Sequence, residues 1–129
     1  MPLGNMLSTG IDLVEIHRIR RSMKNPRFCK KILGSEEYMQ LEKRGFVPQS
    51  VAVSFAAKEA FAKAMGTGVR GFQLRDVELL RNTDGQPYFQ LHHGALELVQ
   101  KKNYKLSVSA THTRVYASVV VVAYVEGIV

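Results

Sequence analysis

The chain has 129 residues, 46% of them hydrophobic and 22% charged, which fits one globular domain with a real core and excludes a disordered chain. Its 18 Lys and Arg residues against 11 Asp and Glu give a net charge of +7, which predicts an anionic partner: nucleic acid, a phosphorylated small molecule or an acidic protein. A single cysteine, Cys29, excludes a disulfide framework and a cluster of metal-binding cysteines.

The sequence favours a cytoplasmic protein. Its N-terminal residues lack the succession of basic, apolar and small residues that makes a signal peptide. The longest uncharged apolar run, Val115 to Val125, is too short to cross a bilayer as a helix, and its valines indicate a buried strand. We therefore expect a reducing compartment and no membrane partner.

The first predicted element is a short apolar strand over residues 6 to 13. Asp12 lies at its end, where an acid can point into a site. From Val14 the apolar spacing predicts a short helix, which Asn25 and Pro26 end.

A strongly basic segment begins on this helix. Seven positive residues and no acidic residue occupy the stretch from Arg18 to Lys31: Arg18, Arg20, Arg21, Lys24, Arg27, Lys30 and Lys31. Because these charges add locally, the surface they form is the predicted docking surface for the anionic partner.

A second helix is predicted to start at Ser35 and to end before Gly45. Ser35 is a good N-cap residue, and Glu36 and Glu37 fall in the first turn, where acids are favourable. We interpret this helix as amphipathic and solvated.

Pro48 and Ser50 introduce a long central helix that ends at Gly66. The helix is apolar on nearly every side, which indicates that it is buried. Glu59 and Lys63 share one strip of it, about 40° apart. An exposed pair at this spacing contributes only ~0.3 to 0.5 kcal/mol, but charges on a buried helix are costly unless they are paired or bind a ligand. The pair is therefore a candidate for function.

The C-terminal half adds four strands and one helix. The strands are predicted at residues 74–80, 88–91, 105–111 and 115–125, and the helix at residues 95–102. Asp84 and Gly85 give the turn signal for a hairpin between the first two strands. The elements together predict a single α+β domain over residues 1–129, with a mainly antiparallel sheet packed against the long buried helix.

Asp12 and Glu59 are the two carboxylates that are hardest to explain structurally, and two hard oxygen ligands suit Mg²⁺. Glu15 is an alternative to Asp12. The adjacent His92 and His93 have no third ligand in recognisable spacing and are weak evidence for zinc. The chain has no GxxxxGK[ST], GxSxG or HExxH motif, so common nucleotidase and hydrolase interpretations have no support.

Three segments resemble one family, the bacterial holo-[acyl-carrier-protein] synthases, which are small 4′-phosphopantetheinyl transferases. They are GIDLVEIHRI from Gly10 to Ile19, FAAKEAFAKAMGTG from Phe55 to Gly68 and, more weakly, the segment from Ser109 to Ala117. The matches follow the order of the family and span nearly the whole chain.

The resemblance implies a reaction and a site. Phosphopantetheine would move from coenzyme A to a serine of apo acyl carrier protein in fatty acid biosynthesis, with release of adenosine 3′,5′-bisphosphate. Asp12 and Glu59 would hold Mg²⁺. Glu59 and Lys63 would be the catalytic pair, with Glu59 accepting the serine proton and Lys63 reaching the phosphates.

The resemblance also implies partners. Gly66, Thr67 and Gly68 would lie along coenzyme A, in a cleft between neighbouring subunits of a homotrimer, and His112 would lie near the ligand. The basic residues that would grip the acidic carrier protein are Arg18, Lys24 and Arg27.

Two positions depart from the family pattern. Ser8 stands where the family commonly has a glycine, and Ser54 stands where it commonly has an arginine. Loss of this arginine predicts one phosphate contact fewer, and Arg70 or Lys58 could replace it.

Two alternatives stay open. A nucleic-acid-binding domain without catalysis explains the basic charge, but it leaves Asp12 and Glu59 unexplained, and the chain lacks tryptophan and a clustered aromatic stacking platform. We therefore expect no nucleic-acid partner. The other alternative is a transferase of the same fold that serves a carrier domain of secondary metabolism.

Overall fold

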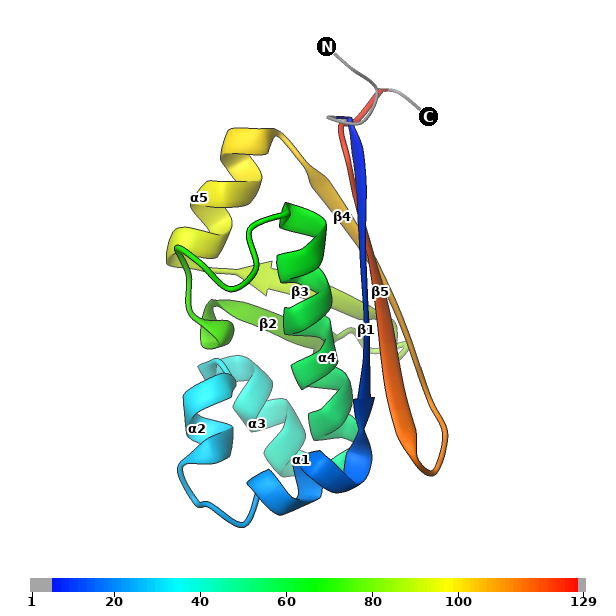
Figure 1. The fold of residues 1–129 in the computed structure, drawn as a ribbon. Helices are drawn as coiled ribbons and strands as arrows, with labels where there is room; N and C mark the ends of the chain where they lie inside the picture. The colour runs from blue at the N-terminus through cyan, green and yellow to red at the C-terminus, as the bar shows by residue number, and fades with distance from the viewer. Residues whose placement is uncertain (1–5, 128–129) are drawn as a thin grey trace.

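The structure is a computed structural model that describes residues 6–127 of the chain. Its elements follow in the order β1 (Leu7–Glu15), α1 (Ile16–Ser22), α2 (Phe28–Ile32), α3 (Ser35–Lys43), α4 (Pro48–Met65), η2 (Leu74–Asp76), β2 (Val77–Arg81), β3 (Pro87–Leu91), α5 (His93–Lys102), β4 (Lys105–His112) and β5 (Tyr116–Tyr124) (Figure 1). No helix in this part of the chain combines the length and the apolar character that a membrane span requires.

The strands form two antiparallel sheets. One has three strands in the order β1-β5-β4, and the other is the hairpin of β2 and β3. Helix α4 lies against β1 and β5 on one side and against β2 on another (Figure 1). The predicted α+β class, with an antiparallel sheet packed on a long buried helix, is confirmed.

Helix α4 has the boundaries that its sequence predicts. Pro48 occupies the first turn, and Gly66 ends the helix at φ +75°, a left-handed conformation that favours glycine. Its buried side chains are mostly small, and they form the centre of the core together with the inward valines of β5. The alanines let neighbouring backbones approach closely.

Gly10 is the closest of these approaches. A Cβ atom at this position would lie 1.9 Å from the carbonyl oxygen of Ala60 and 2.6 Å from the backbone nitrogen of Ala64. Two residues earlier, the hydroxyl of Ser8 donates a hydrogen bond to the carbonyl oxygen of Ala64 at 2.6 Å. Ser8 therefore belongs to the contact between β1 and α4 and gives the last turn of the helix an additional donor.

The outer edge of β2 is covered by side chains rather than by another strand. Gln40 of α3 accepts from the nitrogen of Arg81 at 3.0 Å and donates to its carbonyl oxygen at 3.2 Å. Glu37 accepts from the nitrogen of Leu79 at 3.0 Å, and Lys58 donates to the carbonyl oxygen of Val77 at 2.5 Å. These contacts satisfy backbone groups that an open edge would expose.

The predicted elements differ from the structure in several places. Strand β1 continues to Glu15, so the helix that was predicted from Val14 starts at Ile16. Residues 74–76 form a 3₁₀ turn rather than the start of a strand. The short helix α2 was not predicted, because the basic residues around it have no strong helical pattern.

The first residue of α3 also differs from its predicted role. The N-cap of α3 is Gly34 rather than Ser35. A Cβ atom at Gly34 would lie 2.4 Å from the carboxyl carbon of Glu78, so any larger residue here would require the Glu78 side chain to move. The backbone nitrogen of Gly34 donates to Glu37 at 3.2 Å.

Candidate functional site

Strand β1 directs Asp12 toward α4. Side chains alternate between the two faces of a strand, and Gly10 and Val14 are buried against the helix, so Asp12 between them shares that face. The residue lies within the strand, not at its end as predicted. Glu15 falls on the opposite, exposed face, so the alternative to Asp12 does not point toward α4.

Asp12, Glu59 and Lys63 come together between β1 and α4. The ammonium nitrogen of Lys63 lies 3.4 Å from Oδ1 of Asp12 and donates to the carbonyl oxygen of Ile11 at 2.9 Å. Burial raises the pKa of Glu59, and the charge of Asp12 raises it further, whereas Lys63 and Arg18 lower it. Lys63 thus pairs with Asp12 of β1, although it lies one helical turn after Glu59 on α4 and could have paired with that residue instead.

This set of groups fits a divalent cation with phosphate oxygens. Two carboxylates provide the hard oxygen ligands that Mg²⁺ takes, and it completes its coordination with substrate and water oxygens. Among residues 6–127, no three His, Cys, Asp or Glu side chains gather as a closed metal site. A position completed by a phosphate ligand is therefore the arrangement that these residues favour, and Lys63 adds a positive charge beside it.

The loop after α4 is open to a ligand. Gly66 and Gly68 have φ angles of +75° and +62°, and both are exposed. Thr67 between them donates its hydroxyl hydrogen to the carbonyl oxygen of Gly68 at 2.8 Å. The loop begins one turn after Lys63, so its backbone continues the surface that carries this ammonium group.

The basic segment flanks the same region. Arg18, Lys24 and Arg27 are exposed on α1 and on the turn that leads to α2. The guanidinium carbon of Arg18 lies 5.7 Å from the ring centroid of Phe55, which is one turn before Glu59 on α4. The basic surface therefore reaches the carboxylates.

His112 does not join these residues within one chain. It is exposed at the end of β4, where Nδ1 lies 3.3 Å from the carbonyl oxygen of Thr113. Strand β5 lies between β4 and β1, which separates the two strands by roughly 10 Å.

Ser54 and Lys58 lie on another face of α4. Ser54 is buried near Leu79 and Arg81, and its place on the helix is roughly 180° from that of Lys63. Lys58 is completely buried, so the expectation that it could replace a phosphate-binding arginine is wrong. Arg70 is exposed in the loop after α4.

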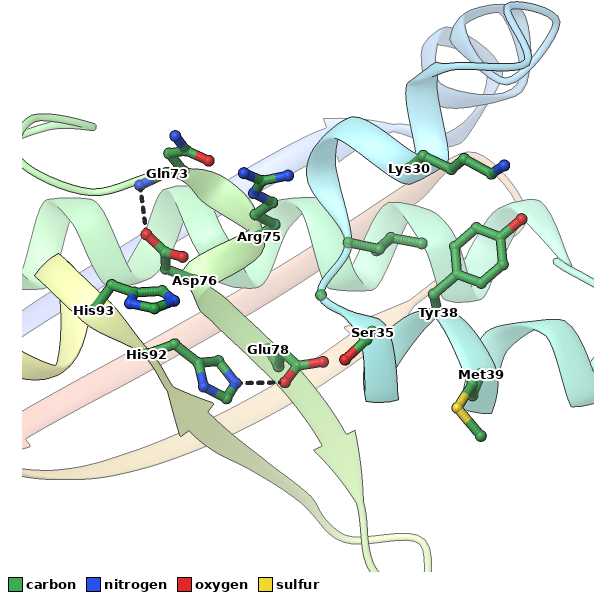
Figure 2. Close-up of a pocket in the computed structure, with 12 residues that line it drawn as sticks. Lys30, Ser35, Tyr38, Met39, Gln73, Arg75, Asp76, Glu78, His92 and His93 are labelled. Carbon is green, nitrogen blue, oxygen red and sulfur yellow. Dashed lines mark hydrogen bonds and ion pairs between the residues drawn. The ribbon is translucent and has the colours of Figure 1, made fainter.

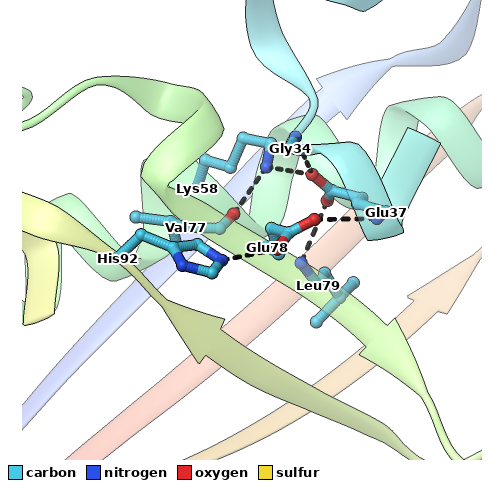
Figure 3. A network of polar contacts seen from close by, with 7 residues as sticks. All are labelled: Gly34, Glu37, Lys58, Val77, Glu78, Leu79 and His92. Carbon is cyan, nitrogen blue, oxygen red and sulfur yellow. Dashed lines mark hydrogen bonds and ion pairs between the residues drawn. The ribbon is translucent and has the colours of Figure 1, made fainter.

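Lys58 belongs to a buried polar network (Figure 3). Its ammonium nitrogen lies 2.7 Å from Oε1 of Glu37. The backbone nitrogen of Glu37 donates to Glu78 at 2.8 Å, and Nε2 of His92 lies 2.6 Å from the other oxygen of Glu78. Burial raises the pKa of Glu37 and lowers that of Lys58, whereas the contact between them acts in the opposite direction for each.

The predicted solvation of α3 is therefore wrong for one of its acids. Glu37 is completely buried. Hydrogen bonds from Gly34, Lys58 and Leu79 compensate its carboxylate for the lost hydration. Lys58 was the signal in the sequence that could have predicted a buried acid. It is a third charged residue on an apolar helix, and a buried charge of this kind needs a partner of opposite charge. Nothing in the sequence distinguishes Glu37 from Glu36 as that partner.

A cleft of about 730 Å³ opens beside this network (Figure 2). Lys30 and Tyr38 line it from α2 and α3, and Arg75 and His93 line it from η2 and α5. Lys30 belongs to the basic segment that the sequence predicts as a docking surface, whereas Asp12, Glu59 and Lys63 do not line this cleft.

Comparisons with known proteins agree on one family. Residues 8–120 match the family model of the 4′-phosphopantetheinyl transferase superfamily. The holo-[acyl-carrier-protein] synthase of Alkaliphilus metalliredigens is 42% identical over 107 residues, which are 81% of this chain and 88% of that protein.

Solved structures of this family have the same fold. The holo-[acyl-carrier-protein] synthase of Neisseria meningitidis superimposes with a TM-score of 0.84 at 32% identity, covering 90% of this chain and 96% of that one. The Helicobacter pylori enzyme, solved in complex with coenzyme A, gives a TM-score of 0.76 at 28% identity, covering 89% of this chain and 98% of that one.

The charges around Glu59 make its pKa a direct test of this arrangement. We expect Asp12→Asn to lower the pKa of Glu59, because it removes a neighbouring negative charge, and Lys63→Met to raise it, because it removes a positive one. Carboxyl-carbon NMR titration without divalent cations measures both shifts. Glu15→Gln is the control and should leave the pKa unchanged. A pKa of Glu59 that is the same in all four proteins contradicts the arrangement.

Proposed function

The chain belongs to the 4′-phosphopantetheinyl transferase superfamily, among the holo-[acyl-carrier-protein] synthases, and on this basis we propose that it transfers 4′-phosphopantetheine from coenzyme A to a serine of apo acyl carrier protein. The second product is adenosine 3′,5′-bisphosphate, and the modified carrier serves fatty acid biosynthesis in the cytoplasm. The observation that carries the proposal is the meeting of Asp12, Glu59 and Lys63 beside an exposed basic surface.

The reaction is a phosphoryl transfer. The serine oxygen forms a bond to the phosphorus that carries pantetheine, and the bond from this phosphorus to the bridging oxygen breaks. Glu59 accepts the serine proton. Lys63 stabilises negative charge on the phosphates. Its ammonium group is exposed and lies beside Asp12, so phosphates that bind next to Asp12 are within its reach.

Asp12 and Glu59 would hold Mg²⁺. When bound there, Mg²⁺ supplies neutralisation of the pyrophosphate charge. Its two protein ligands are close enough for the charge of one to raise the pKa of the other, so the cation also relieves their repulsion. The loop of Gly66, Thr67 and Gly68 binds coenzyme A in continuation of Lys63.

The basic surface docks the carrier protein. Arg18, Lys24 and Arg27 attract an acidic partner, and Arg18 is close enough to Glu59 for its charge to lower the pKa of that carboxyl. A carrier that binds there presents its serine toward the carboxylates.

The outer face of the three-stranded sheet supports a homotrimer. Several large apolar side chains on it are exposed: Leu7, Ile11, Leu13 and Tyr116. A second copy of the chain would cover them. His112 is separated from Asp12 of its own chain by β5, so it would serve the coenzyme A site of a neighbouring subunit.

Transfer is measured directly by mass spectrometry. Apo acyl carrier protein that is incubated with this protein, coenzyme A and Mg²⁺ should gain the mass of one phosphopantetheine group. Asp12→Asn and Glu59→Gln should each lower kcat roughly 100-fold or more, because each removes a charged ligand from the reacting centre. Asp84→Asn, in the exposed turn between β2 and β3, is the control and should keep normal turnover. No mass gain with either Mg²⁺ or Mn²⁺ would sink the proposal.

Charge reversal tests the docking surface. Arg18→Glu with Arg27→Glu should raise KM for the carrier protein by roughly tenfold or more and leave KM for coenzyme A nearly unchanged. The wild-type rate should also fall as salt rises, because screening weakens the attraction. Lys102→Glu, at the end of α5, is the control for a general change in net charge. An unchanged KM for the carrier protein in the double variant excludes this surface.

Sedimentation velocity and subunit mixing test the trimer. The wild-type protein should sediment as three copies, and Leu13→Glu should dissociate it, because a charge replaces an apolar contact. Glu59→Gln and His112→Ala should each be poorly active alone. When they are unfolded and refolded together, activity should return, because some sites then combine two intact subunits. A fully active monomer contradicts the assembly.

A further inference from the structure

Helix α4 carries two sets of charged groups on different sides. Glu59 and Lys63 face β1, whereas Lys58, the residue directly before Glu59, faces α3 and β2. Lys58 is completely buried and bonds to the carboxylate of Glu37 and to the carbonyl oxygen of Val77 (Figure 3). Both partners lie on elements other than α4.

On its remaining surface, α4 makes directional contacts near its C-terminal end, where Ser8 donates to the carbonyl oxygen of Ala64 and Lys63 donates to that of Ile11. Half of its buried residues are alanines, and at Gly10 the strand touches the helix backbone itself. Phe61 anchors the helix between Phe72 and Phe89 through ring contacts with centroid distances of 5.3 and 5.9 Å. Apolar contacts of this kind are not directional, so they tolerate a small rotation or shift of the helix better than hydrogen bonds do.

A small rotation matters for the site. Side-chain atoms about 6 Å from the helix axis move roughly 1 Å when the helix turns by about 10°. A misplacement of about 1 Å at a reacting centre can cost roughly 100-fold in rate. Glu59 therefore depends on whatever fixes the rotation of α4.

We propose that the buried pair of Lys58 and Glu37 is a positioning device that fixes the rotation and axial position of α4, and with them the place of Glu59 relative to Asp12. The inference rests on the proposed function only for its kinetic readout. Glu37 is suited to the task because its carboxylate also accepts hydrogen bonds from the backbone of Gly34 and Leu79. The pair thus ties α4 to the start of α3 and to the edge of β2.

Stability alone is a poor explanation for this pair. Two buried charges lose hydration, and apolar side chains of similar size often give equal or greater stability. In contrast, removing only one partner leaves an uncompensated buried charge, which is strongly destabilising. The informative variant therefore removes both charges and keeps the side-chain lengths.

The test uses two variants. The first is a double variant that combines Lys58→Met and Glu37→Gln, and the second, Gln40→Met, is the control. Gln40 also ties α3 to the edge of β2, through two hydrogen bonds to Arg81, but it does not contact α4 through them. Thermal unfolding establishes that each variant is folded at the assay temperature. Mn²⁺ affinity by calorimetry, the kinetic constants and a crystal structure are then measured for each.

We expect the double variant to bind Mn²⁺ roughly tenfold more weakly and to lose roughly tenfold to 100-fold in kcat, with KM for the carrier protein unchanged. The crystal structure should show Glu59 displaced from Asp12. Gln40→Met should keep wild-type Mn²⁺ affinity and kcat, even where its melting temperature falls as much. Wild-type Mn²⁺ affinity in the folded double variant overturns the inference, whatever the transfer assay gives.

The outcomes separate the two proposals. A wild-type protein without transfer activity refutes the proposed function, while Mn²⁺ affinity and the position of Glu59 still test the positioning role. If the double variant does not fold, Glu37→Asp alone is used, because it keeps both buried charges and shortens one side chain of the pair by one methylene group. It should weaken Mn²⁺ binding less than the double variant is expected to, and an affinity equal to that of the wild type overturns the inference.

Discussion

The direct contact between the backbone of β1 and that of α4 is the constraint on which the site depends. It exists because Gly10 has no side chain and because the short side chains of Ala60 and Ala64 do not hold the strand away from the helix backbone. Residues on one face of a strand recur at every second position, so the same contact turns Asp12 toward the helix. Lys63 then reaches Asp12, and the negative charge of Asp12 acts on Glu59. The carboxylates converge because the packing is tight, not because either one attracts the other.

Like charges that are held together need compensation. Asp12 raises the pKa of Glu59, and Lys63 and Arg18 lower it, so the site combines both signs without neutralising each carboxylate by a single partner. Such an arrangement is costly for folding alone and useful for binding a cation with an anionic ligand. The opposite side of α4 differs, since each oxygen of Glu37 accepts a hydrogen bond from at least one internal donor. One side is therefore available to a ligand and the other is closed.

The sequence predicts the elements better than it predicts their contacts. Local signals such as Pro48 and Gly66 act within one turn of the chain, and they bound α4 correctly. The convergence of Asp12 with Glu59 was inferred from their unusual surroundings, because both are acids in apolar segments. In contrast, Glu37 has the local pattern of an exposed first-turn acid, and only the packing of α3 against β2 buries it. Burial that depends on another element leaves no trace in the local pattern.

The two departures from the family pattern are explained by where they lie on the scaffold. Ser8 is on the face of β1 that meets α4, where its hydroxyl finds the carbonyl oxygen of Ala64, so a small polar residue replaces glycine without leaving a donor unsatisfied. Ser54 is buried beside Leu79 and Arg81, roughly opposite Lys63 on the helix. A side chain that starts from this position is directed away from the carboxylates. Both substitutions therefore change how α4 is packed, and neither of them alters Asp12, Glu59 or Lys63.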